Sequence, residues 1–141
     1  MLLVKKVLVT GLLTVGVSLP VFAQTPDVHI ANYTDYTLTS RINDGYCSSY
    51  FGSAGVTQPQ ERDHIISGSL IGFACSGGDP THCKTDIYLS GDCSGSPVAT
   101  AILDTSAGVT SIAPDYIPDL RLHIKPSGFY ITVTQDPAVS R

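Results

Sequence analysis

The chain has 141 residues, with 12 Asp plus Glu against 8 Lys plus Arg, and a formal net charge of −4 at pH 7. An acidic chain without a basic run is a poor ligand for nucleic acid or an acidic membrane surface, so we expect no nucleic-acid partner. Glu61 is the single Glu, while Gly, Ser, Thr and Pro recur throughout. Helix formers are therefore scarce, and turn and strand formers are abundant.

The N-terminal end has the layout of a secretory signal peptide. Lys5 and Lys6 precede an uncharged apolar run over residues 7–19, and small residues up to Ala23 then predict cleavage before Gln24. The run is shorter than the ~20 residues that a membrane-spanning helix needs, and no later segment is long and apolar enough to be an anchor. The sequence therefore predicts a signal peptide over residues 1–23 and no membrane insertion.

The remaining residues, 24–141, suit one domain with a modest core. Short apolar or alternating runs follow one another here, separated by turn signals. The expected strands cover residues 28–31, 36–42, 64–66, 70–75, 85–90, 98–103, 109–112, 120–124 and 129–134. About eight strands at this spacing predict an all-β domain, a single antiparallel β-sandwich, with a small β-barrel as the alternative. Only residues 45–55 are expected to hold a helical turn.

Four cysteines follow the export signal, and an oxidising destination favours disulfides. A strand over residues 85–90, at ~3.3 Å per residue, would carry Cys93 roughly 20 Å or more from Cys83. A disulfide tolerates a Cα separation of only ~4.4 to 6.8 Å. The turn-rich loop between Cys75 and Cys83 can instead join two antiparallel strands whose ends meet. The sequence therefore predicts two disulfides, Cys75 to Cys83 and Cys47 to Cys93.

No motif predicts a catalytic, cofactor or metal site. Residues 91–97 resemble the nucleophile loop of chymotrypsin-type proteases only faintly, and their register is wrong for it. Asp63 and His64 are adjacent in sequence, but a catalytic triad is defined by geometry and not by adjacency. His82 beside Cys83 lacks the second close ligand pair of a zinc site. We therefore expect neither catalytic residues nor a bound metal or cofactor.

Two aromatic segments are candidate contact surfaces. The first either fills part of the core or forms a binding platform, and it comprises Tyr33, Tyr36, Tyr46, Tyr50 and Phe51. The second is Tyr116 and Ile117, between Pro114 and Pro118, which either packs over an open end of the sandwich or contacts a partner. The prolines stiffen this loop and lower the ordering cost of binding. If the protein binds a partner, we expect Tyr116 and Ile117 in the contact.

Several short segments, spread over most of residues 24–141, are of a structural type and not of a catalytic type. They are Asn32-Tyr33-Thr34 through Arg41-Ile42-Asn43, Cys47-Ser48-Ser49, Gly55-Val56-Thr57, Cys83 through Leu89 with Cys93-Ser94-Gly95, and Gly108 through Ile112. In these segments the chain resembles a group of small exported proteins of intracellular gamma-proteobacteria. The resemblance implies a bacterial periplasmic or type II secreted product of unassigned activity, and it carries no catalytic residue to this chain.

Together these features predict a secreted or periplasmic, disulfide-stabilised binding or interaction module. We expect a monomer that acts outside the cytoplasm on an unidentified protein or glycan partner of a host or of the envelope, as a virulence-associated protein would. The alternative is a small secreted hydrolase with an unidentified Asp and His active site, and a third class is a structural envelope protein. A deep pocket with converging Asp, His or Glu61 would favour the hydrolase, and a flat surface the binding module.

Overall fold

The computed structural model of the protein describes residue 16 and residues 24–138. The predicted signal peptide, residues 1–23, lies outside the described residues apart from residue 16, and the cleavage site at Ala23 and Gln24 stays a prediction.

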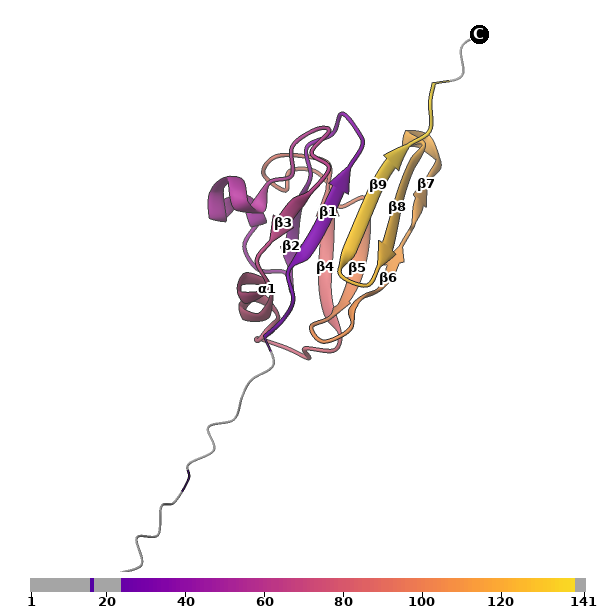
Figure 1. Ribbon diagram of the computed structural model, residues 1–141. Coiled ribbons are helices and arrows are strands. Elements are labelled where there is room, and N and C mark those ends of the chain that lie inside the picture. The colour runs from indigo at the N-terminus through magenta and orange to yellow at the C-terminus, as the bar shows by residue number, and fades with distance from the viewer. Residues whose placement is uncertain (1–15, 17–23, 139–141) are drawn as a thin grey trace, which may run out of the picture.

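Two β-sheets pack face to face, with strand orders β3-β1-β9-β8-β7 and β2-β4-β5-β6 (Figure 1). The five-stranded sheet contains β1 (Val28–Asn32), β3 (His64–Ile66), β7 (Tyr116–Ile117), β8 (Leu122–Ser127) and β9 (Tyr130–Gln135). The four-stranded sheet contains β2 (Thr39–Ile42), β4 (Cys83–Tyr88), β5 (Ala99–Asp104) and β6 (Gly108–Ala113). The predicted β-sandwich is therefore confirmed, and the sheets do not close into a barrel. All pairs are antiparallel except β1 with β9, which run parallel.

The core lies between the two sheets because each strand turns alternate residues inward. Strand β5 shows the period directly, with buried and half-buried residues alternating along its length. Leu122 and Ile124 of β8 and Val133 of β9 are almost completely buried. These three branched side chains make the centre of the core on the five-stranded sheet.

The strand predicted over residues 70–75 is wrong, because this segment is part of helix α1 (Gly68–Cys75). A short apolar run without polar interruptions has no period that separates a buried strand from a buried helix. Gly68, Ile71 and Cys75 are the buried residues of α1, at the three- and four-residue spacing of one helix face. Gly68 also allows the helix to contact the backbone of Thr25, where a Cβ would collide with the Thr25 carbonyl.

Two 3-10 segments complete the fold, η1 (Ser48–Gly55) and η2 (Pro118–Leu120). Helical structure within residues 45–55 is thus confirmed. Segment η1 is kinked at Phe51 and Gly52, and Gly52 takes a φ of +69°, which a residue without a Cβ adopts readily.

One disulfide connects a helical segment to the start of β4 and the other to the loop after β4, and both match the predicted pairing. Cys47, just before η1, bonds Cys93, with a Cα separation of 5.8 Å. Cys75, the last residue of α1, bonds Cys83, the first residue of β4, with a Cα separation of 5.6 Å. The loop between Cys75 and Cys83 therefore joins a helix to a strand, and not two strands as expected.

Candidate binding cavity

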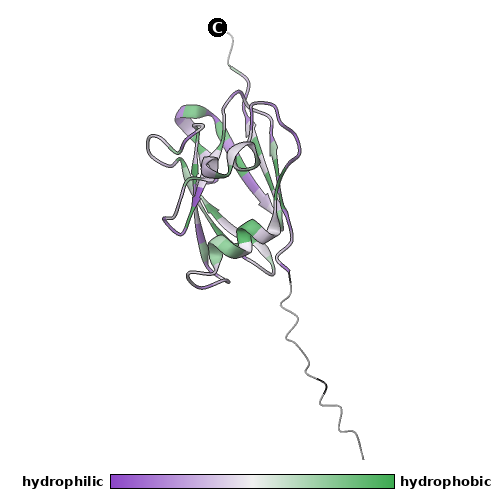
Figure 2. Cartoon of the chain, turned by 90° about the vertical axis from the view of Figure 1, so that its left-hand side faces the viewer, coloured by the Kyte–Doolittle hydropathy of each residue, from purple (hydrophilic) through white to green (hydrophobic). Residues whose placement is uncertain are grey.

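A cavity of about 340 Å³ opens between the two sheets, at the edge where β2 and β3 lie. Segments α1 and η1 cross this edge, and Figure 2 looks onto it, with α1 coloured largely as apolar. The inner wall consists mainly of aliphatic side chains from both sheets. Ile30, Ile131 and Val133 face it from the five-stranded sheet, and Ile87 and Leu103 from the four-stranded sheet.

Small side chains on the inner face of the four-stranded sheet leave this space unfilled. Thr85 of β4 lies opposite Ala101 of β5, and Ser40 of β2 lies opposite Ile87 of β4. All four line the cavity. Ser40, Thr85 and Ala101 are small and share one region of the sheet. The branched side chains of the opposite sheet therefore cannot close the gap, and the sandwich stays hollow there.

Exposed aromatic side chains surround the mouth of the cavity. Tyr46, Tyr50, Phe51 and Phe73, which we call the aromatic rim, are 76%, 73%, 41% and 76% exposed. Tyr46 stacks on Tyr50, and Tyr50 meets Phe51 edge to face. Tyr46, Phe51 and Phe73 also line the cavity. Large exposed apolar surface of this kind marks a contact site on a soluble domain.

The residues of the first aromatic segment differ in exposure, and the aromatic rim also includes Phe73, which lies outside that segment. Tyr46, Tyr50 and Phe51 form a surface cluster, whereas Tyr36 is half-buried against the core. Phe73 was not among the sequence-predicted contacts because its segment was assigned to a strand. In helix α1 it lies on the side opposite Ile71 and Cys75, so a helical assignment would have predicted its exposure.

Charged side chains are absent from the cavity wall. Among the described residues, no Asp, Glu, His, Lys or Arg lines it. The Oγ1 atom of Thr85 is fully buried, and it is the only such side-chain oxygen or nitrogen of residues 24–138 for which no hydrogen-bond partner is found. Among the described residues, the cavity wall thus offers mainly apolar contact, with a few hydroxyl groups and no ionised side chain.

The adjacent residues Asp63 and His64 have different partners and do not act together. Asp63 is hydrogen-bonded to Nδ1 of His29 at 2.9 Å. His64 is buried, with Nδ1 at 2.8 Å from Oε1 of Glu61 and Nε2 at 3.0 Å from the carbonyl oxygen of Ala54. His64 therefore links β3 to η1, and its role at the cavity edge is structural.

Hydrogen bonds also set the charge state of Glu61. Burial alone would raise its pKa, but the Gln58 N–H, 2.7 Å from Oε2, and the ring of His64 together lower the pKa below the ordinary value of 4.5. An ionised Glu61 holds both partners at once. The pair thereby fixes the loop that leads into β3.

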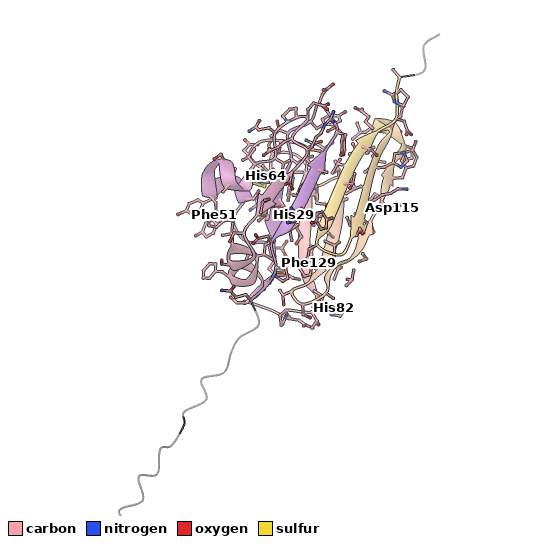
Figure 3. The ribbon with its side chains drawn as sticks, in the orientation of Figure 1. His29, Phe51, His64, His82, Asp115 and Phe129 are labelled. Atoms are coloured by element: carbon pink, nitrogen blue, oxygen red, sulfur yellow. A yellow bond between two sulfur atoms is a disulfide. The ribbon has the colours of Figure 1, made fainter. Side chains whose placement is uncertain are left out.

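The remaining histidines lie elsewhere, each beside its own carboxylate. His82 lies 3.6 Å from Asp79, and Nε2 of His123 lies 3.0 Å from Asp136. Figure 3 shows His82 apart from His29 and His64, which lie on the neighbouring strands β1 and β3. Among the described residues, no group of three or more His, Cys, Asp or Glu side chains is placed to hold a metal ion.

Tyr116 and Ile117 lie on β7, at the opposite end of the five-stranded sheet from β3. The segment is a short strand paired with β8, and not the free loop expected. Tyr116 is 39% exposed and stacks on His123, with ring centroids 4.4 Å apart. Ile117 is half-buried and packs against the core. Neither lines the cavity, and their contact with a partner stays a prediction.

The two layers, the hollow edge and the two disulfides define a small disulfide-bonded β-sandwich with an apolar cavity. No family model and no curated protein matches the chain. The fold is similar to the crystal structure of NttC, a type II secretion system substrate of Legionella pneumophila, with a TM-score of 0.59. The match covers 78% of this chain and 97% of that chain at 15% sequence identity, so it shows a shared fold. Within residues 24–138, no helix is long and apolar enough to cross a membrane.

Proposed function

We propose that this protein is an exported binding module that takes a small apolar molecule into the cavity between its sheets. The observation that carries the proposal is the cavity itself, about 340 Å³ in volume, walled by aliphatic side chains and entered past the aromatic rim. Binding sites for small molecules are concave, mostly apolar and at least ~300 Å³ in volume. Closing such a wall on an apolar ligand removes water from both surfaces and stabilises the complex.

Three features support a place of action outside the cytoplasm, in the periplasm or beyond. The sequence predicts a signal peptide over residues 1–23, and both disulfides require an oxidising compartment to persist. The fold is that of a protein described as a type II secretion substrate, which makes the same route a reasonable expectation for this chain. We propose that the protein works there as a monomer.

The composition of the cavity supports binding over hydrolysis. A hydrolase needs a positioned acid, base or nucleophile at the reacting atoms. The described histidines pair with separate carboxylates, and none of them lines the cavity. The hydrophobic lining therefore favours retention of a ligand and not its cleavage.

The test is uptake of the fluorescent probe 1-N-phenylnaphthylamine by the exported protein with both disulfides intact. We expect saturable binding by the wild type. Ala101→Leu places a larger side chain in the cavity and should weaken probe binding at least about tenfold, given ~0.8 kcal/mol per CH₂ contact that the probe loses. Ala107→Leu, at an exposed turn, is the matched control and should bind normally. Absence of binding to the wild type, or equal binding by Ala101→Leu, would contradict the proposal.

A further inference from the structure

The hydroxyl groups on the cavity wall fall into two sets. Thr39, Ser48 and Ser76 each donate their hydroxyl to a backbone carbonyl of the protein. Within the described residues, the hydroxyls of Ser40 and Thr57 make no hydrogen bond, although both residues line the cavity. We call Ser40 and Thr57 the hydroxyl pair.

Two other hydroxyls on the wall also lack a protein partner, but their exposure differs from that of the hydroxyl pair. Tyr46 is 76% exposed, so bulk water reaches its hydroxyl. Oγ1 of Thr85 has almost no accessible surface, and it is the only unpartnered side-chain oxygen or nitrogen of residues 24–138 enclosed in this way. The oxygens of the hydroxyl pair therefore keep surface at the cavity wall, although Thr57 as a residue is only 2% exposed.

Backbone hydrogen bonds hold the hydroxyl pair together at β2. Leu38 and Thr57 exchange N–H···O bonds of 2.9 and 3.0 Å. Ser40 follows Leu38 by two residues on the same face of the strand, and its N–H donates to Oγ of Ser48 at 2.9 Å. Diagonal neighbours of this kind have Cβ atoms less than about 8 Å apart. Because an O–H···O bond is about 2.8 Å long, one polar group of a ligand between the two side chains can hydrogen-bond both.

The hydroxyl pair has a cost that packing alone does not explain. A buried hydroxyl without a partner destabilises a fold, and Val in place of Thr57 would have nearly the same shape without that cost. The protein fixes the backbone of both residues and leaves their hydroxyls free. A few polar groups placed in this way on an apolar wall are suited to orienting a ligand.

The rest of the wall restricts the charge and the shape of that ligand. No ionised side chain among the described residues lines the cavity, and an unpaired charge is far more costly to move into an apolar interior than a neutral hydrogen-bonding group. The aliphatic lining continues from Ile87, opposite Ser40 in the sheet register, to Val109 on β6. Strand β6 is three strands from β2, or about 14 Å at ~4.8 Å per strand. The space therefore fits an extended apolar chain with an uncharged polar end.

The volume sets the size of the ligand. An apolar cavity of about 150 Å³ accommodates benzene, so a cavity of 340 Å³ holds about a dozen non-hydrogen atoms. Resting on the proposed function above, we infer that the cavity binds a medium-chain aliphatic molecule whose uncharged polar end hydrogen-bonds the hydroxyl pair. The aliphatic chain then lies along the inner face of the four-stranded sheet toward β6.

The inference is tested by displacing 1-N-phenylnaphthylamine with 1-decanol or with decanoate at pH 8. For the wild type we expect 1-decanol to compete at a concentration at least about tenfold lower than decanoate, because only the carboxylate carries a charge into the cavity. In Thr57→Val and in Ser40→Ala the inhibition constant of 1-decanol should rise about fivefold, the usual effect of one neutral hydrogen bond. The affinity of the probe is measured directly for each variant and enters that constant.

Further variants separate the hydroxyls from other effects. Thr57→Ser keeps the hydroxyl and should retain 1-decanol binding within about twofold. Thr132→Val on β9 and Ser111→Ala on β6 make the matching exchanges at residues that do not line the cavity, and both should behave as wild type. Thr57→Val should unfold at a denaturant concentration no lower than wild type, which shows that it folds.

The possible failures are distinct. If the wild type does not take up the probe, the proposed function is wrong and the assignment of its ligand fails with it. If the probe binds but 1-decanol competes equally in wild type, Thr57→Val and Ser40→Ala, the cavity is a binding site and the role of the hydroxyl pair is wrong. A loss in only one of the two variants would overturn the shared contact. Equal competition by decanoate and 1-decanol would overturn the requirement for an uncharged group.

Discussion

The two edges of the sandwich are closed by different means. At the edge formed by β6, β7 and β8, the interior is filled by side chains, and Leu122 and Ile124 are completely buried. At the edge formed by β2 and β3, the helical segments α1 and η1 span the gap over the cavity. One disulfide joins the end of α1 to the first residue of β4, and the other joins the residue before η1 to the loop between β4 and β5. We call these the packed edge and the hollow edge.

The difference has a physical basis. A helix that covers a cavity buries little apolar surface against the sheets, so packing contributes less to holding it in place. A disulfide restrains the chain without needing a filled interior, chiefly by reducing the entropy of the unfolded state. The hollow edge can therefore keep an apolar space open, provided that both disulfides are formed.

The largest expected effect is the loss of a side chain at the packed edge. Leu122→Ala should reduce the free energy of unfolding by about 3 to 5 kcal/mol, because it leaves a void in a filled core. Leu70→Ala, a half-buried residue at the cavity wall, should cost less than about 2 kcal/mol because the space beside it is already open. Urea unfolding measures both. Equal losses would mean that the two edges are packed alike.

The next largest effects come from the disulfides. Replacing Cys47 and Cys93 by Ala should cost about 4 kcal/mol, and replacing Cys75 and Cys83 about 2.5 kcal/mol, following the lengths of the closed loops. The second double variant should also bind 1-N-phenylnaphthylamine more weakly, because it frees the end of α1 that carries Phe73. A variant that is folded and binds the probe as wild type does would show that the hollow edge does not depend on this disulfide.

Strands β6 and β8 of the packed edge followed in large part from the sequence, because alternation along a strand and the turns between strands are local signals, whereas β7 was expected as a loop. The disulfide pairing also followed, since β4 separates Cys83 from Cys93 in the structure as in the prediction. Helix α1 did not follow, because its eight residues are mostly apolar and lack a clear period. The cavity depends on Ser40, Thr85 and Ala101, which are far apart in sequence and become neighbours only through the register of the sheet.

Acid should weaken the fold by a smaller amount. Hydroxyl and backbone hydrogen bonds from Thr81, Ser94 and Ser106 lower the pKa values of three carboxyl groups that lie in turns or at the end of a strand. These are Asp79, Asp92 and Asp104. The pKa of Glu61 is also lowered in the folded state. A carboxyl group with a lowered pKa contributes stability fully above its unfolded pKa and loses it as the pH falls through the folded value.

The free energy of unfolding should therefore decrease from about pH 5 downward, through the range near and below pH 4. Glu61→Gln should remove part of this dependence and cost less than about 1 kcal/mol at pH 7, because the carboxyl group is partly exposed. Asp119→Asn is a matched control, since this exposed carboxylate of η2 makes no side-chain hydrogen bond within the described residues. Denaturant unfolding across pH 3 to 7 gives the comparison. A free energy of unfolding that rises as the pH falls would contradict the lowered pKa values of these carboxyl groups.

The smallest expected effect is at Tyr116 on the packed edge. Its side chain is 39% exposed and stacks on His123, so Tyr116→Ala should cost about 1 kcal/mol or less. Ile117→Ala should cost more, because that side chain is half-buried against the core. Neither change should affect probe binding, since β7 and β3 lie at opposite ends of the five-stranded sheet.

If Tyr116 instead contacts a macromolecular partner, as the sequence predicts, Tyr116→Ala should weaken that contact while uptake of the probe stays normal. Loss of probe binding in a folded Tyr116→Ala variant would show that the two edges are coupled, and that the packed edge and the hollow edge cannot be treated as independent parts of one sandwich.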